Sequence, residues 1–310
     1  MSKTAFVFPG QGAQAVGMGR DAFDASEQAR AIFHEADEAL GFKLSSIIFD
    51  GPEAALKQTA NTQPALLTVS AAYMALLEES GLKPDYVAGH SLGEYSALLA
   101  ANVVSFRDAV KIVRARGQYM EEAVPDGQGA MAAVLGAERE ALAALCASIS
   151  GECSSVELAN VNCPGQIVVS GSAEGVEAVV QRGKEAGAKR VIPLEVSGPF
   201  HSSLMKPAAE RLSEALSGIA IGDASVPVVA NVTARPATGG EDIRRLLVEQ
   251  VYSPVLWEDT VRYLIAEGVD TFIEIGSGSV LAGLIKKVDK GVKVVSINSM
   301  AALDTLQVKQ

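Results

Sequence analysis

Short apolar runs alternate along the chain with longer segments in which apolar residues recur at helical spacing. Several runs are apolar throughout rather than at every second position, which is typical of strands buried on both faces of a parallel sheet. The runs lie at 4–10 (TAFVFPG), 86–91 (YVAGHS), 226–232 (VPVVANV), 271–276 (TFIEIG) and 292–298 (VKVVSIN). Strands that alternate with helices in this way indicate an α/β architecture.

The clearest predicted helix lies at residues 63–81 (QPALLTVSAAYMALLEESG). Pro64 near its first turn and Gly81 after its last turn are typical of helix ends. The spacing of its apolar residues predicts one stripe along the helix. This stripe consists of Leu66, Val69, Tyr73, Leu76 and Leu77. We therefore expect a helix that begins close to Pro64 and presents one apolar face.

Residues 127–196 depart from this alternation. They show a strand, a helix near 138–148, two further strands, a helix near 173–187 and a last strand. The order β-α-β-β-α-β is that of a ferredoxin-like unit. We therefore expect a ferredoxin-like subdomain at 127–196, inserted into a core formed by residues 1–126 and 197–310.

Charge and hydropathy narrow the range of partners. The chain has 310 residues with 26 basic and 37 acidic side chains, which gives a formal charge of −11. Such a charge argues against a general role in binding nucleic acid or anionic membranes. No apolar run approaches the roughly 18 residues that a membrane span needs, and the N-terminal segment lacks the pattern of a signal peptide. We expect a cytoplasmic protein that binds neither nucleic acid nor a membrane.

The cysteines and histidines do not suggest a metal site. The chain has three of each, and Cys146, Cys153 and Cys163 form no Cys-x-x-Cys pair. Structural zinc sites need four such ligands at characteristic spacings. We therefore expect no metal.

The strand at 86–91 leads into a turn that is typical of catalytic serines. Gly89-His90-Ser91-Leu92-Gly93 matches Gly-x-Ser-x-Gly, and an alanine-rich helix follows it. In this setting Ser91 lies at a helix N-terminus, where free N–H groups stabilise negative charge, and the N–H of Leu92 is placed to donate to an oxyanion. The alternative is a plain turn, because the pentapeptide also occurs by chance.

A serine nucleophile needs a base, and only three histidines are available. The charged neighbours of His34 predict that it faces water, and His90 points away from Ser91 because successive residues of a strand face opposite ways. His201, in a Gly-Pro loop that opens a helix, is therefore the predicted base. A capping or packing role for His201 stays open at this point.

Arg116 provides the clue to the substrate. The segment 105–124 (SFRDAVKIVRARGQYMEEAV) predicts a helix with a capping box at Ser105 and Asp108. Arg116 falls on the apolar stripe of this helix, and an unpaired buried charge costs several kcal/mol. Its partner is either an acidic residue of the chain or a carboxylate of the substrate, which the planar guanidinium binds in bidentate fashion.

Two glycine-rich turns give weaker signals. FPGQGAQ at 8–14 follows the first strand, and its glycines allow backbone N–H groups to approach a ligand oxygen. IGSGSVLAGL at 275–284 lacks the lysine of a P-loop and the full dinucleotide-binding fingerprint. We interpret the second turn as the start of a helix.

Several longer motifs resemble those of malonyl-CoA:acyl carrier protein transacylases of bacterial fatty acid synthesis. The resemblance extends over essentially the whole chain. The motifs are FPGQGAQ, TQPALL, GHSLGEYSAL, RGQYMEEAVP, ANVNCPGQIVVSG, VSGPFHSSLM and QVYSPVLW, in the order and spacing of that family. The resemblance implies an α/β-hydrolase-like core with a parallel sheet, and transfer of malonyl from malonyl-CoA to acyl carrier protein. It implies no cofactor, because the CoA thioester is itself a substrate. We expect a monomer.

The resemblance also implies roles for individual residues. Ser91 carries the acyl group as an ester, His201 is its base, and the backbone carbonyl of Gln250 orients the imidazole. The N–H groups of Gln11 and Leu92 form the oxyanion hole. The remaining residues bind the substrate: Arg116 holds the malonyl carboxylate, Phe200 crowds an α-methyl group, and Asn160 lies near the site.

Three other functions fit part of this pattern. A serine thioesterase or esterase also uses Gly-x-Ser-x-Gly with a later histidine. A trans-acting polyketide-type malonyl acyltransferase shares the chemistry but serves another carrier protein. A non-catalytic module that binds carrier protein or CoA is the alternative outside enzymes, against which a complete Ser–His pair argues.

Overall fold

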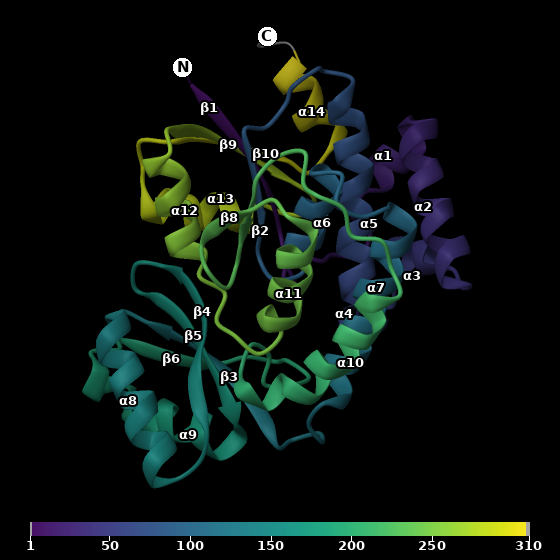
Figure 1. The fold of residues 1–310 in the computed structure, drawn as a ribbon. Coiled ribbons are helices and arrows are strands. Elements are labelled where there is room, and N and C mark those ends of the chain that lie inside the picture. The colour runs from purple at the N-terminus through teal and green to yellow at the C-terminus, as the bar shows by residue number, and fades with distance from the viewer. Residues whose placement is uncertain (1, 308–310) are drawn as a thin grey trace.

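The computed structural model describes residues 2–307 and shows two sheets, with helices packed on both faces of the larger one (Figure 1). The strands are β1 (Lys3–Phe8), β2 (Tyr86–Gly89), β3 (Gly129–Leu135), β4 (Val156–Cys163), β5 (Gln166–Ser172), β6 (Arg190–Pro193), β7 (Val228–Ala230), β8 (Arg235–Ala237), β9 (Val269–Ile275) and β10 (Lys293–Ile297). The α-helices are α1 (Arg20–Ala25), α2 (Glu27–Leu40), α3 (Leu44–Asp50), α4 (Glu53–Lys57), α5 (Thr59–Glu78), α6 (Gly93–Ala100), α7 (Phe106–Glu122), α8 (Arg139–Glu152), α9 (Ala173–Arg182), α10 (Lys206–Ser217), α11 (Gly240–Gln250), α12 (Trp257–Ala266), α13 (Val280–Val288) and α14 (Met300–Gln307). Two short 3₁₀ turns, η1 (Gly183–Ala186) and η2 (Ser203–Met205), complete the elements.

The larger sheet contains the five strands that the apolar runs predicted. Its order is β10-β9-β1-β2-β7-β8, and every pairing is parallel except that of the edge strand β8. This arrangement confirms the predicted α/β class. Because parallel strands point the same way, the carboxyl ends of β1, β2 and β7 lie together at one edge of the sheet, where α/β proteins place their ligands.

Successive side chains of a strand point to opposite faces of the sheet, and this explains why these runs are apolar throughout. In β1, Phe6 and Phe8 contact one hydrophobic cluster, whereas Ala5 and Val7 contact another on the opposite face. The first cluster includes α2, α5, α7 and α10, and the second includes α12 and α13 (Figure 1). Both faces of the sheet are therefore buried, which requires apolar side chains at successive positions.

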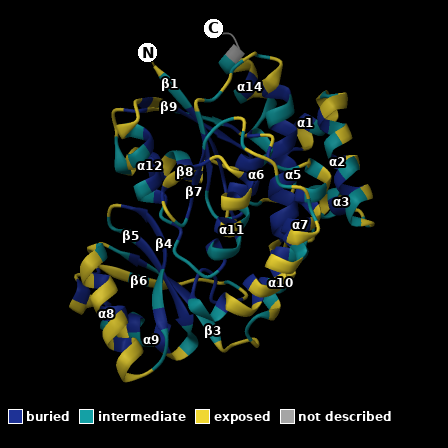
Figure 2. Ribbon diagram, in the orientation of Figure 1, coloured by how far each residue is buried: buried dark blue, intermediate teal, exposed yellow. Residues whose placement is uncertain are grey.

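Helix α5 differs from the prediction in its start and in its burial. It begins at Thr59 rather than near Pro64, and it is buried around nearly its whole circumference (Figure 2). Pro64 lies inside the helix and has no N–H to give to the carbonyl of Ala60. Arg114 Nη1 donates to that carbonyl at 3.0 Å. A partner from another helix thus replaces the missing backbone hydrogen bond, which the local sequence did not reveal.

The smaller sheet is antiparallel and comes from the segment 129–193. Its strand order β4-β5-β3-β6 is that of a ferredoxin-like unit, and α8 and α9 pack on one face over a hydrophobic cluster of their own. The predicted β-α-β-β-α-β order is confirmed, although the second predicted helix ends at Arg182 and continues as the 3₁₀ turn η1.

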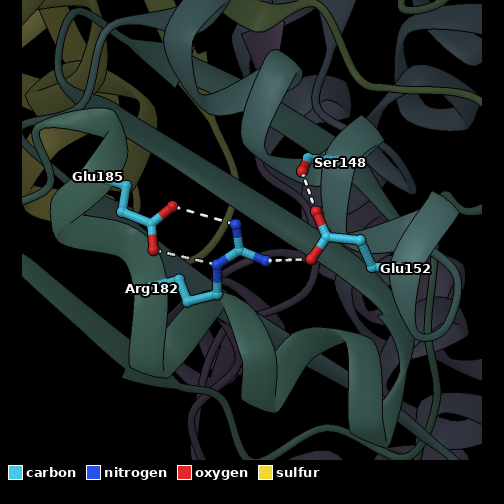
Figure 3. A network of polar contacts seen from close by, with 4 residues as sticks. All are labelled: Ser148, Glu152, Arg182 and Glu185. Atoms are coloured by element: carbon cyan, nitrogen blue, oxygen red, sulfur yellow. Dashed lines mark hydrogen bonds and ion pairs between the residues drawn. The ribbon is translucent and has the colours of Figure 1, made fainter.

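Surface ion pairs join the two helices of this smaller unit. Arg182 at the end of α9 contacts Glu185 and Glu152, and Ser148 donates to Glu152 (Figure 3). These side chains are one-third to more than one-half exposed, and exposed ion pairs contribute only about 0–1 kcal/mol each. The apolar cluster between sheet and helices therefore holds this unit together.

The smaller sheet is attached to the core beside its β4 strand. Val161 N donates to Val255 O at 2.9 Å, and Val255 N donates to Ala159 O at 2.8 Å. Glu157, also in β4, accepts hydrogen bonds from the backbone N–H and the hydroxyl of Ser203. Strand β4 thus fixes the loop before α10 to the smaller sheet.

No helix among residues 2–307 is long and apolar enough to cross a membrane.

The turn between β2 and α6 is packed too closely for side chains at two positions. A Cβ at Gly89 would lie 1.9 Å from the carbonyl carbon of Gly93, and one at Gly93 would lie 2.1 Å from the carbonyl oxygen of Phe8. In both cases the obstacle is backbone, which cannot rotate away. The two glycines of the motif are therefore required by the packing of β1, β2 and α6.

Gly93→Ala should destabilise the protein by about 2 kcal/mol or more, in the range of overpacked cores. Gly151→Ala is the matched control, because nothing lies within 4 Å of a Cβ at that helical position. The control should be neutral or stabilising by up to about 1 kcal/mol. Melting temperatures measured by calorimetry test this pair, and equal values for Gly93→Ala and the wild type would contradict the packing argument.

Candidate active site

Ser91 lies in the sharp turn between β2 and α6, with a backbone φ of 51°. A positive φ is unusual for a residue with a side chain and is a feature of nucleophile elbows. Asn231, which follows β7, supports the turn from the next strand. Its Oδ1 accepts from Ser91 N at 2.7 Å, and its Nδ2 donates to Gly89 O at 2.7 Å. The strained turn is thus held by both of its ends.

His201 lies beside the serine hydroxyl. Its Nε2 is 2.7 Å from Ser91 Oγ, and its Nδ1 is 2.8 Å from the backbone oxygen of Gln250. A carbonyl only accepts, so Nδ1 carries the proton and Nε2 is free to receive the one on Ser91. The pair has the geometry of a nucleophile and its general base, with a carbonyl in place of the usual carboxylate.

Arg116 lies on the buried face of α7 with 1% of its surface exposed. Its Nη1 donates to Gln63 Oε1 at 2.7 Å, and its Nη2 donates to Gln250 Oε1 at 2.9 Å. The same Nη2 lies 3.1 Å from Ser91 Oγ. The guanidinium is therefore in direct contact with the Ser91 hydroxyl.

These contacts leave the positive charge of Arg116 without a direct counter-ion. Each of its hydrogen-bond acceptors is a neutral oxygen, and no carboxylate in residues 2–307 lies within ion-pair distance. An unpaired buried charge is unfavourable by several kcal/mol. The arrangement therefore favours an anionic group that arrives with a ligand, and it argues against the alternative of a directly paired acidic residue.

Two backbone N–H groups are available beside the serine. Neither the N–H of Gln11 nor that of Leu92 is bonded to another group among the described residues. The loop that carries Gln11 lies directly on the turn, since a Cβ at Gly10 would be 2.3 Å from His90 O. Free N–H groups at such a position suit the oxyanion of a tetrahedral intermediate.

One cleft of about 240 Å³ between the two sheets is lined by five of these residues: Gln11, Ser91, Leu92, Arg116 and His201. One wall comes from Ser91, His201 and Arg116, and the opposite wall from β4 and β5 of the smaller sheet. The exposed Val280 at the start of α13 lies at its margin. The volume suits a small acyl group, and the bulk of a larger thioester must lie outside.

Comparisons with known proteins agree with this geometry. The family model described as "Acyl transferase domain" matches residues 5–307. A malonyl CoA-acyl carrier protein transacylase from Bacillus subtilis (strain 168) is 55% identical over 304 residues, which are 98% of this chain and 96% of the relative. Its counterpart in Staphylococcus aureus (strain MSSA476) is 52% identical over 97% of each chain. The chain belongs to the malonyl-CoA:acyl carrier protein transacylase family.

Solved structures give the same result for the fold. The crystal structure of an acyl carrier protein S-malonyltransferase from Vibrio cholerae O1 biovar eltor covers 98% of this chain and 100% of its own, with 45% identity and a TM-score of 0.96. A malonyl-transacylase in complex with a type II PKS acyl-carrier protein covers 100% of both chains, with 42% identity and a TM-score of 0.96.

The structure of this transacylase also places the other residues that the sequence analysis discussed. Asn160 in β4 and Phe200 beside His201 both line the cleft. His34 is exposed, as predicted. His90 points away from Ser91 to Asn162, with 2.8 Å between Nε2 and Oδ1. The glycine turn before α13 is a helix start, as predicted, and the carboxylate of Glu274 accepts from the first N–H groups of that helix.

Several polar groups of the site had not been found from sequence. Gln63 binds Arg116, Asn231 supports the turn, and Asn162 binds His90. Glu94, three residues after the nucleophile, is buried and bonded to Asn231 and Gln250. All four residues lie in the segments TQPALL, GHSLGEYSAL, ANVNCPGQIVVSG and VPVVANV, but no local pattern shows that the fold brings them together.

The surroundings of His201 keep its imidazole neutral. Burial, and next the positive charge of Arg116, lower the pKa of His201 to about 3. In the unfolded chain the pKa is close to 6.5. Between these values the unfolded state binds a proton that the folded state does not, so this group's contribution to stability is lost as the pH falls from about 6.5 toward 3.

We expect His201 to remain the neutral Nδ1–H tautomer at pH 5.5. Nitrogen NMR of histidine-labelled protein measures this directly, since the chain has only three histidines, and His201→Gln assigns the signal. An imidazolium spectrum for His201 at pH 5.5 would contradict the account of its environment.

Proposed function

We propose that Ser91 carries malonyl between malonyl-CoA and the phosphopantetheine thiol of acyl carrier protein, in a ping-pong reaction that supplies fatty acid elongation. The observation that carries this proposal is the buried guanidinium of Arg116, without a counter-ion and 3.1 Å from the Ser91 hydroxyl. A substrate acyl group attached at Ser91 brings its own carboxylate within reach of that charge. Malonyl-CoA and acyl carrier protein are accordingly the two substrates.

In the first half-reaction His201 Nε2 takes the proton of Ser91 as Oγ attacks the thioester carbonyl. The Oγ–C bond forms, and the carbonyl oxygen becomes an oxyanion bound by the N–H groups of Gln11 and Leu92. Each such donor contributes about 3–4 kcal/mol in comparable sites. The C–S bond then breaks, and His201 returns the proton to the sulfur of coenzyme A.

The second half-reaction uses the same groups in reverse. The phosphopantetheine thiol gives its proton to His201 and attacks the malonyl-serine ester. Collapse of the second tetrahedral intermediate returns the proton to Ser91 and releases malonyl-carrier protein. Throughout, the carbonyl of Gln250 holds Nδ1–H of His201, so that Nε2 faces the reacting atoms.

The charge of Arg116 also couples substrate identity to the strength of the base. This charge lowers the pKa of His201. A malonyl carboxylate paired with the guanidinium would cancel much of that effect, so the imidazole would become more basic when malonyl is bound. Acetyl-CoA lacks the carboxylate and leaves Arg116 unpaired. Sites of this polar kind discriminate by factors of about 10⁴.

The remaining roles are proposed on their position in the cleft. Phe200, which is 6% exposed beside His201, would crowd an α-methyl group, and Asn160 contributes polar surface from β4.

We further propose that residues 127–196 form a subdomain inserted into the core of residues 1–126 and 197–310, since they enclose their own hydrophobic cluster. We also propose that the protein is a monomer and acts in the cytoplasm, where fatty acid elongation uses its product.

A serine thioesterase is the second candidate, and the Ser91–His201 pair alone fits it equally well. Arg116 separates the two functions. Hydrolases need no cation at the acyl position, whereas a malonyl carrier uses one both to select its substrate and to hold the ester.

Arg116→Ala should lower kcat/KM for malonyl transfer by about 10²- to 10⁴-fold and should raise acetyl transfer relative to malonyl transfer. The measurement is the ratio of kcat/KM for malonyl-CoA and acetyl-CoA, with carrier protein as acceptor.

Arg107→Ala is the matched control on the same helix. Arg107 pairs with Glu38 at the exposed surface, away from the cleft. Its substitution should leave the malonyl-to-acetyl ratio unchanged. The same ratio in wild type and Arg116→Ala would contradict the assignment of the carboxylate site.

A further inference from the structure

A buried carboxyl group lies behind the catalytic residues without touching the cleft. Glu94 is the second residue of α6, three positions after Ser91, and 2% of its surface is exposed. Its Oε2 accepts from Asn231 N at 3.0 Å and from Gln250 Nε2 at 2.9 Å. A carboxyl group in this position is unfavourable unless it serves as an acceptor for other groups.

The side-chain amide of Gln250 is the group that Glu94 orients. Its Nε2 faces three acceptors, at 2.9 Å from Glu94 Oε2, 3.0 Å from Ser91 O and 3.2 Å from Asn231 Oδ1. Its Oε1 accepts from Arg116 Nη2 at 2.9 Å. An amide turned over by 180° would point its NH₂ group at a guanidinium, which has no acceptor.

Resting on the function proposed above, we propose that Glu94 is a positioning residue for the malonyl carboxylate site. It holds the Gln250 amide in the orientation that keeps Arg116 directed at Ser91. Glu94 is also linked to Arg116 through hydrogen bonds. Arg116 donates to the side-chain amide of Gln250, and that amide donates to the carboxyl group of Glu94. The amide keeps the two charges apart, so the guanidinium remains free to bind the carboxylate of the substrate.

The backbone of Gln250 has a separate role from its side chain. Its carbonyl, which binds His201, belongs to the last residue of α11, and the position of that carbonyl follows from the helix. Loss of the Glu94 acceptor should therefore disturb Arg116 more than His201. This difference distinguishes positioning from a general loss of structure.

The acceptor geometry of Glu94 does not depend on its full ionisation. Burial raises the pKa of Glu94 to about 7, although its hydrogen bonds with Asn231 and Gln250 act in the opposite direction. Oε2 accepts the same two hydrogen bonds whether or not Oε1 carries a proton. A glutamine at this position offers the same single oxygen, so Glu94→Gln should retain most of the activity.

The test compares Glu94→Leu with Glu94→Gln in transfer from malonyl-CoA and from acetyl-CoA. Glu94→Leu should lower kcat/KM for malonyl by about 10- to 100-fold, the effect of leaving buried N–H donors without an acceptor, and should lower the acetyl value less. Glu94→Gln should restore the malonyl-to-acetyl ratio. In an Arg116→Ala background, Glu94→Leu should leave that ratio without further change.

Asp37→Leu is the control for the loss of a buried carboxyl group. Asp37 in α2 accepts from the backbone and hydroxyl of Ser45, remote from the cleft, and is 6% exposed. Its substitution should lower the melting temperature without changing the ratio. If Glu94→Leu fails to fold, Gln250→Leu gives the same readout, because it removes the amide and keeps the carbonyl.

Two outcomes overturn this inference. Either Glu94→Leu or Gln250→Leu preserves the wild-type malonyl-to-acetyl ratio, or Glu94→Gln loses it as fully as Glu94→Leu. A wild-type enzyme with no preference for malonyl would instead overturn the proposed function, so the two failures are distinguishable.

Discussion

The guanidinium of Arg116 is charged and excluded from water, and the chain gives it amide oxygens rather than a carboxylate. An arginine with a direct acidic partner would have had its charge neutralised, with little left to attract a substrate. Here the charge is stabilised by dipoles at short range and by Glu94 beyond the amide of Gln250. The rest of the site is arranged around this one charge.

The fold brings these groups together at the carboxyl edge of a parallel sheet. β2 ends in the nucleophile turn, β7 ends next to Asn231, and β1 leads into the loop of Gln11. Helix α7 packs on buried α5, which places Arg116 beside Gln63. His201, the proposed base, lies in a loop that strand β4 holds through Glu157 and Ser203. Residues separated by more than a hundred positions therefore meet because three strands end together.

The sequence predicted the parts of this site that have local signals. Ser91 has a motif, His201 is one of only three histidines, and Arg116 interrupts an apolar stripe. The role of Gln250 came from family resemblance alone, because a backbone carbonyl has no sequence signature. Glu94 was missed because an acidic residue in the first turn of a helix is common at the surface as well.

The fold was predictable to a similar degree. Apolar runs identified the strands of the larger sheet, and the β-α-β-β-α-β order identified the smaller one. The predicted start of α5 was wrong. A proline is typical of the first turn of a helix, because further along it leaves a backbone carbonyl without a donor. Here Arg114, from a distant part of the chain, donates to that carbonyl, which belongs to Ala60. Long-range contacts of this kind decide where a helix begins, and no local pattern contains them.

The central claim is that malonyl is carried on Ser91 and handed to a thiol. Intact-protein mass spectrometry after brief exposure to malonyl-CoA tests it most directly, followed by addition of carrier protein. The wild type should gain the mass of one malonyl group and lose it to the carrier protein, and Ser91→Ala should gain none. An adduct on Ser91→Ala, or full-rate release of free malonate without an acceptor, would contradict the account.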